Sequence, residues 1–557
     1  IPSDAAEYVK DRNRRVLQAR RLSEENTRLL RGELFPLLDN IITAGPGDVE
    51  NLEDFAASLQ EGAAYLDLVL CYSLHSALIV YARHWGLRDM LIRELYNGAM
   101  ALFYMQNILS LSGQSRYRLK MSLLFSEAAS YIRQYDDIES QETRGYIHRA
   151  MGNLALVYSD LTKEDGAKKM AAIRRSLRIL TDPAFRDKSP DLPFELYIYK
   201  SHQERTTGLG LFRAGIEDHE ILREVIESAE YVMDVQLKNC EKQGGQPATR
   251  WRYVYEAAQY HCGVQDLGYL LGWFEKIYME RDEGDYSGEG VYRNMFIPAL
   301  YAFYLDTSPQ YRASKKSVME LMYRRIGKYM RRMPDHQLSE STIKNLIACL
   351  QTFVEYPDGI LEKDFILDLV VCRSPDTFVA SKMASHVAGL MAEYAAQNCP
   401  DCLLGALGCD TPQLVKENRR RLRRFAEEGC LLHNVGILPF NHLVRRIGRS
   451  WLEEEKEMYE CHVLAGRELL DRSESTRPYI QAALGHHRFY SGRDGYPAGY
   501  SREDDENAPM TDLISAAVHL VRMVDNRVFL SAEAMGLQDA LKIILGEAGD
   551  RIAPCWA

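Results

Sequence analysis

The stretch LDLVLCYSLHSALIVYARHWG, residues 66–86, is the most apolar part of the chain and decides its fold class. Its large apolar residues recur in steps of 4, 3 and 4, which places them on one face of an α-helix: Leu74, Leu78, Tyr81 and Trp85. The stretch also contains four ionisable residues, Asp67, His75, Arg83 and His84. It therefore lacks the roughly 20 largely uncharged residues that a membrane span requires, and we expect a buried helix and no membrane contact.

Helical spacing of this kind dominates the rest of the sequence, and strand-like alternation is hard to find over a comparable length. Segments rich in glycine and proline, such as 43–48, 241–247 and 356–359, divide the chain into helical lengths. We therefore predict an all-α protein. Because 557 residues exceed the usual size of one compact core, we expect more than one domain.

The breaks predict three parts: an N-terminal helical region over 1–345, a connecting helical segment over 346–374 and a C-terminal domain over 375–557. The proline-containing break at 373–376 and the confinement of all the motifs described below to the last part place the final boundary. We expect the C-terminal part to fold as a compact helical domain that is independent of the N-terminal region.

One segment of the N-terminal region, residues 149–172, resembles a tetratricopeptide repeat in its small and aromatic positions: Leu154, Ala155, Tyr158 and Ala167. The signature does not recur cleanly at a 34-residue period. We interpret the region as a tetratricopeptide-like solenoid of helical hairpins, whose concave surface would receive a protein partner or a signal. An unrelated helical domain is the alternative.

The overall charge and the cysteines limit the class of protein. The chain carries 79 acidic and 68 basic residues, and its net charge of −11 argues against binding a nucleic-acid polymer or an anionic membrane. Eleven cysteines without regular spacing indicate reduced thiols and a cytoplasmic location. The sequence begins at Ile1, so it leaves open a preceding start or targeting segment.

The stretch GHHRFYSGRDGYPAGY, residues 485–500, places His486 and His487 ahead of a glycine-rich turn. Each buried imidazole needs a hydrogen-bond partner or a metal, because leaving one unpaired costs roughly 1–3 kcal/mol. Gly492, Gly495 and Pro497 predict a rigid turn, since glycine permits positive φ angles and proline restricts the exit. We expect this turn to hold Tyr496 beside a metal pocket.

Further candidate ligands lie in the last third of the chain. His386 is in step with Val379, Met383 and Leu390, which predicts that its side chain projects from an apolar helix face towards the core. The same periodicity turns three more side chains inward, His462, His487 and Asp525. For any one of them a satisfied core residue is the alternative, but several in one helical domain favour a metal site.

Four motifs then occur in order: LLHNVGILPF (431–440), CHVLAGRELL (461–470), GHHRFYSGRDGYP (485–497) and VRMVDNRV (521–528). Over roughly 375–535 this order resembles the HD-GYP branch of the HD phosphohydrolases. The resemblance implies an all-helical domain that holds two or three metal ions, usually iron or manganese. It also implies hydrolysis of cyclic di-GMP, a nucleotide of bacterial signalling.

Carried over residue by residue, the resemblance implies two ligand sets. One metal would be held by His386, His433 and Asp525, and a second by His462, His486 and His487. Such nitrogen-rich sets suit divalent transition metals, and two adjacent ions can hold both the attacking and the leaving oxygen of a phosphodiester.

The departures from the family pattern are as informative. The aspartate that bridges the metals in intact members is Asn434 here, and a neutral amide replaces a carboxylate poorly. The lysine expected near substrate phosphate is Ile437, which removes a cation that would stabilise the transition state. The glutamate after the double histidine is Arg488, and Lys382 stands where three-metal members have an acidic ligand. A third metal is therefore not expected.

Basic and aromatic side chains near these motifs are the candidates for substrate contact: Arg445, Arg449, Arg488 and Tyr496. Two interpretations from different classes follow. We favour a receptor that binds metal or a cyclic dinucleotide with lost or weak hydrolysis and that signals to a protein partner through the N-terminal region. The alternative is an active, metal-dependent cyclic di-GMP phosphodiesterase. A helical scaffold with a relict site is the third hypothesis, and the sequence leaves a homodimer open.

Overall fold

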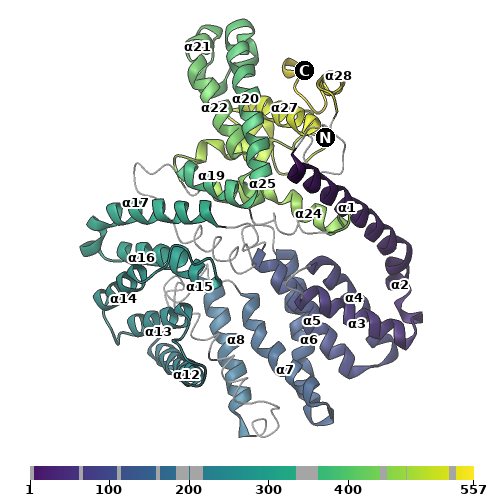
Figure 1. Cartoon of the computed structure of the whole chain (residues 1–557), viewed down its shortest axis with the longest axis vertical. Coiled ribbons are helices and arrows are strands. Elements are labelled where there is room, and N and C mark those ends of the chain that lie inside the picture. Colours follow the sequence, from purple (N-terminus) through teal and green to yellow (C-terminus); the bar gives the residue numbers. More distant parts are fainter. Residues whose placement is uncertain are drawn as a thin grey trace. The chain divides into compact units, whose positions relative to one another are not determined.

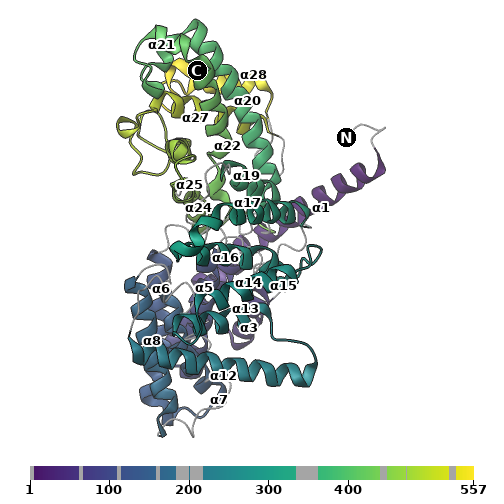
Figure 2. The same ribbon diagram turned by 90° about the vertical axis from the view of Figure 1, so that its left-hand side faces the viewer.

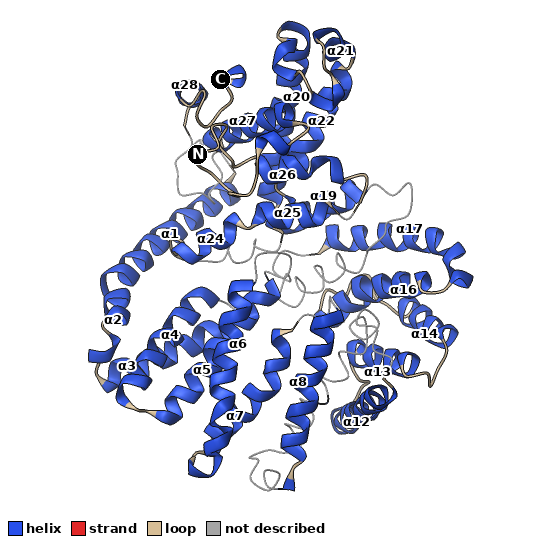
Figure 3. Cartoon of the chain, turned by 180° about the vertical axis from the view of Figure 1, so that it is seen from behind, coloured by secondary structure: helices blue, strands red, loops and turns tan. Residues whose placement is uncertain are grey.

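The computed structural model describes residues 6–61, 67–108, 115–158, 163–183, 200, 218–333, 362–438, 448–471, 473–525 and 535–557. Within these ranges the regular structure is helical, and the only β pairings are two isolated bridges, Arg488 with Gly495 and Ala548 with Ile552 (Figure 3). The all-α prediction is confirmed. None of the helices in the described ranges combines the length and the apolar character that crossing a membrane requires.

The chain divides into two compact units. The first comprises Ile1–Ile108, Gln114–Glu280 and Arg446–Leu452, and the second comprises Leu109–Gly113, Arg281–Arg445 and Glu453–Ala557. The division at Glu280 lies earlier in the chain than the predicted boundaries at 345 and 375. It does so because packing continues from α17 through α19 to α20, all within the second unit.

The first unit is a succession of helices in which α3 packs on α4, α4 on α5, α5 on α6 and α6 on α7 (Figure 1). Its helices are α1 (Glu7–Leu29), η1 (Leu30–Leu34), α2 (Phe35–Asp39), η2 (Ile41–Thr43), α3 (Pro46–Glu61), α4 (Leu68–Trp85), α5 (Arg88–Ile108), α6 (Ser115–Ser130), η3 (Tyr131–Asp137), α7 (Gln141–Asn153), η4 (Leu154–Val157), α8 (Lys163–Thr181), α12 (His219–Gln243), α13 (Thr249–His261) and α14 (Leu267–Met279).

The second unit is built around α20, which packs against both α22 and α27 (Figure 2). Its helices are α15 (Gly288–Val291), η6 (Tyr292–Phe296), α16 (Ile297–Asp306), α17 (Pro309–Arg332), α19 (Glu362–Arg373), α20 (Pro375–Asn398), η8 (Pro400–Leu403), η9 (Ala406–Gly408), α21 (Pro412–Glu417), α22 (Arg419–Leu432), η10 (Val435–Ile437), α24 (Glu453–Glu460), α25 (His462–Leu470), η11 (Arg477–Tyr479), α26 (Ile480–Gly485), η12 (Arg502–Asp504), α27 (Ala508–Val524), α28 (Leu537–Gly546) and η13 (Pro554–Trp556).

The stretch that decided the fold class forms α4, and its predicted burial is confirmed. Leu74 and Leu78 are fully buried, whereas Trp85 at the last position is 57% exposed. Asp67 caps the first turn, because its side chain accepts a hydrogen bond from the Leu70 amide at 3.0 Å. Gly86 ends the helix in the left-handed conformation with φ 65°.

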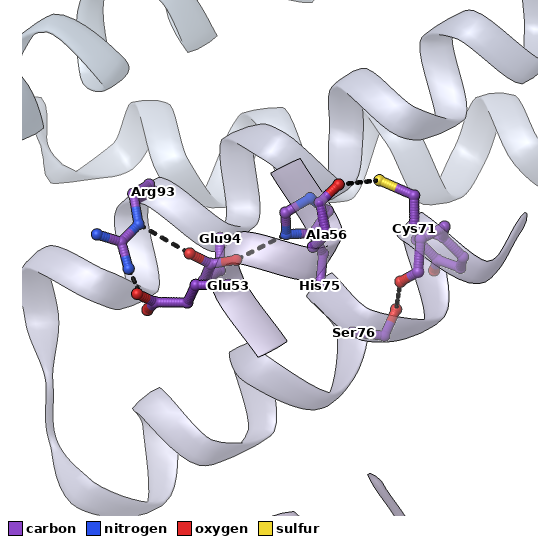
Figure 4. Close-up of polar contacts among 8 residues, drawn as sticks. Glu53, Ala56, Cys71, His75, Ser76, Arg93 and Glu94 are labelled. Atoms are coloured by element: carbon purple, nitrogen blue, oxygen red, sulfur yellow. Dashed lines mark hydrogen bonds and ion pairs between the residues drawn. The ribbon is translucent and has the colours of Figure 1, made fainter. Parts of the chain in front are cut away.

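A buried chain of polar contacts ties α3, α4 and α5 together (Figure 4). His75 Nδ1 lies 2.7 Å from Glu94 Oε2, and Arg93 Nε donates to Glu94 Oε1 at 2.8 Å. Arg93 also donates to Glu53 on α3. Burial alone would raise the pKa of Glu94, but the contacts with His75 and Arg93 lower it overall. Glu94 thus links His75 to Arg93 in one network, although the second ring nitrogen of His75 is buried without a hydrogen-bond partner among the described residues.

The segment that resembled a tetratricopeptide repeat is only partly in the core. Ala155 is fully buried, but it lies in the 3₁₀-helix η4, and Ala167 is exposed on α8. The core-position prediction for Ala167 is wrong because α8 buries a different face, which includes Met170 and Ile173. Repetition of the tetratricopeptide type stays a prediction.

Arg449 anchors the segment Arg446–Leu452 in the first unit. Its Nε and Nη2 donate to the two carboxylate oxygens of Asp67, each at 2.8 Å, and its Nη1 donates to the Ser450 carbonyl at 2.9 Å. Asn26 adds a hydrogen bond to the Gly448 carbonyl at 2.9 Å. Both charged side chains are almost fully buried, so each depends on the other for solvation.

We predict that Asp67→Asn destabilises the first unit by about 3–5 kcal/mol, because it leaves the Arg449 guanidinium buried without its counter-charge. Asparagine is a good N-cap, so the start of α4 should survive the change. The measurement is thermal unfolding of the full chain followed by circular dichroism. The double variant Asp67→Leu with Arg449→Met should lose less than Asp67→Asn alone, and a larger loss would contradict this account.

Candidate metal centre

Three histidines from two packed helices converge in the second unit. His462 begins α25, and His486 and His487 directly follow α26. One ring nitrogen from each of the three lies within 4.8 Å of the others. His462 is fully buried and His486 is 4% exposed. Among the described residues, this is the group of side chains that could together hold a metal ion.

Backbone carbonyls fix the proton on one nitrogen of each buried ring. A carbonyl oxygen only accepts, so the Nδ1 atom that contacts it must carry the hydrogen, and Nε2 keeps its lone pair. Each carbonyl belongs to the residue three positions earlier on the same helical turn. The three contacts are His433 with Cys430 at 2.6 Å, His462 with Tyr459 at 2.6 Å and His486 with Ala483 at 2.9 Å.

The lone pairs of two rings therefore face each other. His462 Nε2 lies 3.3 Å from His486 Nε2, although neither nitrogen has a hydrogen to donate in this tautomer. Two nitrogens that share one tetrahedral ion at about 2.0–2.1 Å stand roughly 3.4 Å apart. The observed separation thus fits a shared cation, and it is unfavourable for two neutral rings alone.

The centre holds its imidazoles neutral. Burial lowers the pKa of His433 to about 4 and that of His462 to about 3. The pKa values of His486 and His487 also lie well below the usual value, first because of burial and then because of the neighbouring histidines. Neutral imidazole is the form that binds a metal, so these ligands need no deprotonation at neutral pH.

The segment with His433 and Asn434 lies beside this cluster. The His433 and His486 ring centroids are 4.7 Å apart at an interplanar angle of 83°. The Asn434 side-chain oxygen is buried and accepts no hydrogen bond from any described residue. A buried oxygen without a hydrogen-bond donor, on the residue that follows His433, is compatible with a cation, since oxygen and imidazole donors together suit divalent transition metals.

A glycine brings the two ligand-bearing segments together. A Cβ atom on Gly436 would lie 1.9 Å from the His462 carbonyl oxygen and 2.3 Å from the Gly466 nitrogen. Only a residue without a side chain allows η10 to approach α25 so closely. Ile437 follows and is buried at 4% exposure, so its apolar side chain belongs to the packing.

The glycine-rich turn forms as predicted beside the cluster. Gly492 and Gly495 have φ angles of 69° and 80°, and the prediction of positive φ is confirmed. The Tyr496 ring lies 4.5 Å from the His487 ring and 6.0 Å from the His462 ring. The expectation that the turn holds Tyr496 beside the histidines is therefore confirmed.

Arg488 stabilises this turn. Its Nη1 donates to the Gly495 carbonyl at 2.8 Å, and its Nη2 donates to the Gly492 carbonyl. The guanidinium thus cross-links the two ends of the turn, which explains why an arginine follows the double histidine. We assign Arg488 to positioning Tyr496 instead of to the predicted substrate contact.

The other predicted arginines do not add to the centre. Arg449 belongs to the first unit, where Asp67 and Ser450 take up its donors. Its side chain is a buried structural partner, so the structure supplies no support for a phosphate contact. Arg445 lies outside the described residues.

The predicted orientation of His386 is wrong. On α20, His386 is exposed, and Val379, Met383 and Leu390 on the same side are 47%, 41% and 64% exposed. The helix instead buries its small residues, because it packs closely on α22 and α27, and a Cβ atom on Gly389 would already meet the Glu427 side chain at 2.6 Å. The buried face of α20 therefore consists of small residues that permit close helix packing, and its large apolar residues lie on the exposed face.

The remaining implied ligand is Asp525, and Lys382 marks the position where three-metal members have an acidic ligand. Asp525 is half-buried at the C-terminal end of α27, and Lys382 is exposed on α20. Of the ligand set His386, His433 and Asp525, His433 lies against the cluster, with its ring centroid 4.7 Å from that of His486. The exposure of His386 argues against the first implied ligand set, whereas the second set is the histidine cluster itself.

Sequence reasoning missed Arg522 on α27. Burial lowers the pKa of His462 and of His487, and the positive charge of Arg522 lowers both further. Burial raises the pKa of Tyr496, which the same charge opposes. Arg522 is exposed, so its charge is open to a ligand. Its position one helical turn before Asp525, inside a recognised motif, was a signal that could have identified it.

Comparison with known proteins adds no family assignment. No protein-family model matches the sequence, and no curated protein matches it significantly. The likeness to HD-GYP proteins therefore remains a resemblance carried by four motifs. Function has to be argued from the centre itself.

We predict that Gly436→Ala disrupts the centre, because the added methyl group would overlap the backbone of α25. The loss should exceed about 3 kcal/mol in stability of the second unit and should lower its metal affinity. Gly499→Ala is the matched control, since nothing lies within 4 Å of a Cβ atom there. Thermal unfolding and metal titration of both variants test this; equal behaviour would show that the approach at Gly436 can relax.

Proposed function

We propose that the second unit binds one divalent transition-metal ion through His462, His486 and His487, and that the protein is a metal-dependent receptor for a cyclic dinucleotide such as cyclic di-GMP. Hydrolysis would be lost or weak. The observation that carries the proposal is the pair of unprotonated Nε2 atoms of His462 and His486, which face each other at 3.3 Å. A cation between them removes the repulsion of two lone pairs.

The chemistry of the donors supports a transition metal. Imidazole nitrogen is intermediate between hard and soft ligands. Three neutral imidazoles therefore suit iron, manganese or zinc better than calcium or magnesium, which prefer oxygen. When bound, the ion would supply a positive charge and open coordination positions for an anionic ligand. The Asn434 oxygen is a candidate for a fourth, weaker contact, because it is buried and without a described donor.

The chain's own residues argue against efficient hydrolysis. Two-metal cleavage of a phosphodiester needs a second ion about 3.5–4 Å from the first, and His386, a ligand implied for that ion, is exposed on α20. Asn434 cannot supply the charge of a bridging carboxylate. Ile437 stands where the family has a lysine, and its side chain is buried in the core. These features favour a binding role over catalysis.

Arg522 and Tyr496 support recognition of a nucleotide. An exposed guanidinium near the histidines can contact phosphate oxygens in the bidentate manner that arginine favours. The half-buried Tyr496 ring, tilted by 30° relative to the His487 ring at 4.5 Å, offers an aromatic surface beside the histidines. Binding of a protein partner by the tetratricopeptide-like first unit and formation of a homodimer remain parts of the same proposal.

We predict that the purified full chain, reconstituted with iron, manganese or zinc, holds about one ion per chain by elemental analysis, and that His462→Ala lowers the affinity at least about 10-fold. His386→Ala is the matched control. That histidine is exposed, so its removal should leave the affinity unchanged. A loss of metal in His386→Ala equal to that in His462→Ala would instead favour the two-metal ligand sets.

We predict that the metal-loaded chain binds cyclic di-GMP and turns it over slowly or not at all. Arg522→Ala should weaken binding about 10-fold, because it removes a charge-assisted contact worth roughly 1.5–3 kcal/mol. Arg493→Ala, which removes an exposed arginine from the nearby turn, should have little effect. Calorimetric titration measures the affinities, and chromatography of the nucleotide measures turnover. Rapid turnover by the unaltered chain would establish the enzyme instead of the receptor.

A further inference from the structure

The first unit contains a cavity of about 480 Å³ that none of the motifs predicted. Pockets that bind small molecules typically measure about 300–1,000 Å³ and are mostly apolar, with a few polar groups that fix orientation. Five of its lining residues are leucines and one is a phenylalanine: Leu29, Leu30, Leu34, Leu37, Phe55 and Leu70. Its lining is therefore aliphatic with a single aromatic ring.

The wall from Leu30 to Leu34 is the π-helix η1, which lies between α1 and α2. A π-helical turn is wider than an α-helical one, is rare, and is frequent at functional sites. Leu29 and Phe55 remain 37% and 38% exposed, so the cavity leaves apolar surface in contact with water. A ligand that covers these side chains would remove their apolar surface from water, and this burial would stabilise the complex.

The polar residues of the cavity include Asn26 and Arg449. Asn26 donates a hydrogen bond at 2.9 Å to the carbonyl of Gly448, the residue before Arg449. The charge of Arg449 is balanced by Asp67, which it contacts at 2.8 Å through two nitrogens. Glu33 adds a further negative charge to the lining. Because Asp67 neutralises Arg449 and Glu33 is exposed to water, the buried polar end of the cavity offers no net charge, and a charged head group placed there would lose its hydration without meeting a counter-charge.

We propose that this cavity binds an uncharged amphiphile: an aliphatic chain of about ten carbons with a neutral hydrogen-bonding head group, such as a hydroxyl or an ester. The leucines enclose the chain, and the head group lies towards Asn26 and Arg449. This site is separate from the metal centre, because all of its residues belong to the first unit.

The position of Arg449 in the sequence gives the site a consequence. Residues 446–452 belong to the first unit, and the chain runs directly on from them into α24 and then to His462 at the start of α25. An occupant of the cavity therefore binds against the segment that leads into a ligand-bearing helix.

Calorimetric titration of the full chain with 1-decanol, decanoate and decyltrimethylammonium, each below its micellar concentration, tests the proposal. 1-Decanol should bind at least 10-fold more tightly than either charged probe. Leu34→Trp, which fills the cavity, should weaken that binding at least 10-fold, whereas Leu119→Trp should not. Leu119 is the matched control, because it is 61% exposed on α6 and does not line the cavity.

Circular dichroism establishes that each variant is folded. If Leu34→Trp unfolds, Leu29→Trp repeats the test at a position that already tolerates exposure. The proposal is overturned if the unaltered chain binds none of the probes, if it binds the charged probes as well as 1-decanol, or if the folded tryptophan variants bind like the unaltered chain. Self-association of the chain that is blocked by Leu34→Trp, with no binding of 1-decanol, would assign the cavity to a second copy and overturn it equally. Metal content stays unchanged in all of these outcomes, so they are distinguishable from failure of the metal proposal.

Discussion

The contact between the Gly436 backbone and the His462 carbonyl sets the dimensions of the centre. With no side chain between them, η10 and α25 approach closely, and His433, just before η10, lies with its ring 4.7 Å from that of His486. Each ring is then oriented by a carbonyl one turn earlier, which leaves the Nε2 atoms pointing inward. Positioning here comes from the backbone, so the side chains that meet a ligand are held by groups that substitution cannot remove.

Sequence reasoning succeeded where local chemistry decides the structure. The spacing of Leu74 and Leu78 fixed a buried helix, and the glycines at 492 and 495 required the positive φ angles that the turn adopts. Helical periodicity gave the wrong orientation for His386, because it shows which residues share a helix face but not which face packs against neighbouring helices. On α20 the packed side consists of alanine, serine and glycine, whose small size permits two neighbours to approach. That choice depends on tertiary contacts, and a single sequence does not contain them.

The arginines illustrate the same limit for charge. Arg449 and Arg488 were expected to meet phosphate, but a carboxylate holds the first and two carbonyls hold the second. Arg522, which was not predicted, is exposed, and its charge contributes to lowering the pKa of His462 and His487. A cation is identified by residue type, whereas its availability depends on partners that are remote along the chain. The Asp67–Arg449 pair, 382 residues apart, is the clearest case.

The chain leaves the second unit after Arg445, enters the first for seven residues and returns at Glu453. Neither unit is therefore a continuous length of sequence, and no single cut separates them without removing a piece of one from its neighbours. A fragment that begins at any point after Asp67 carries Arg449 without its counter-charge. Exchange of one unit by recombination at a linker would leave Arg449 as a buried charge without its partner, so we expect the chain to tolerate such an exchange poorly.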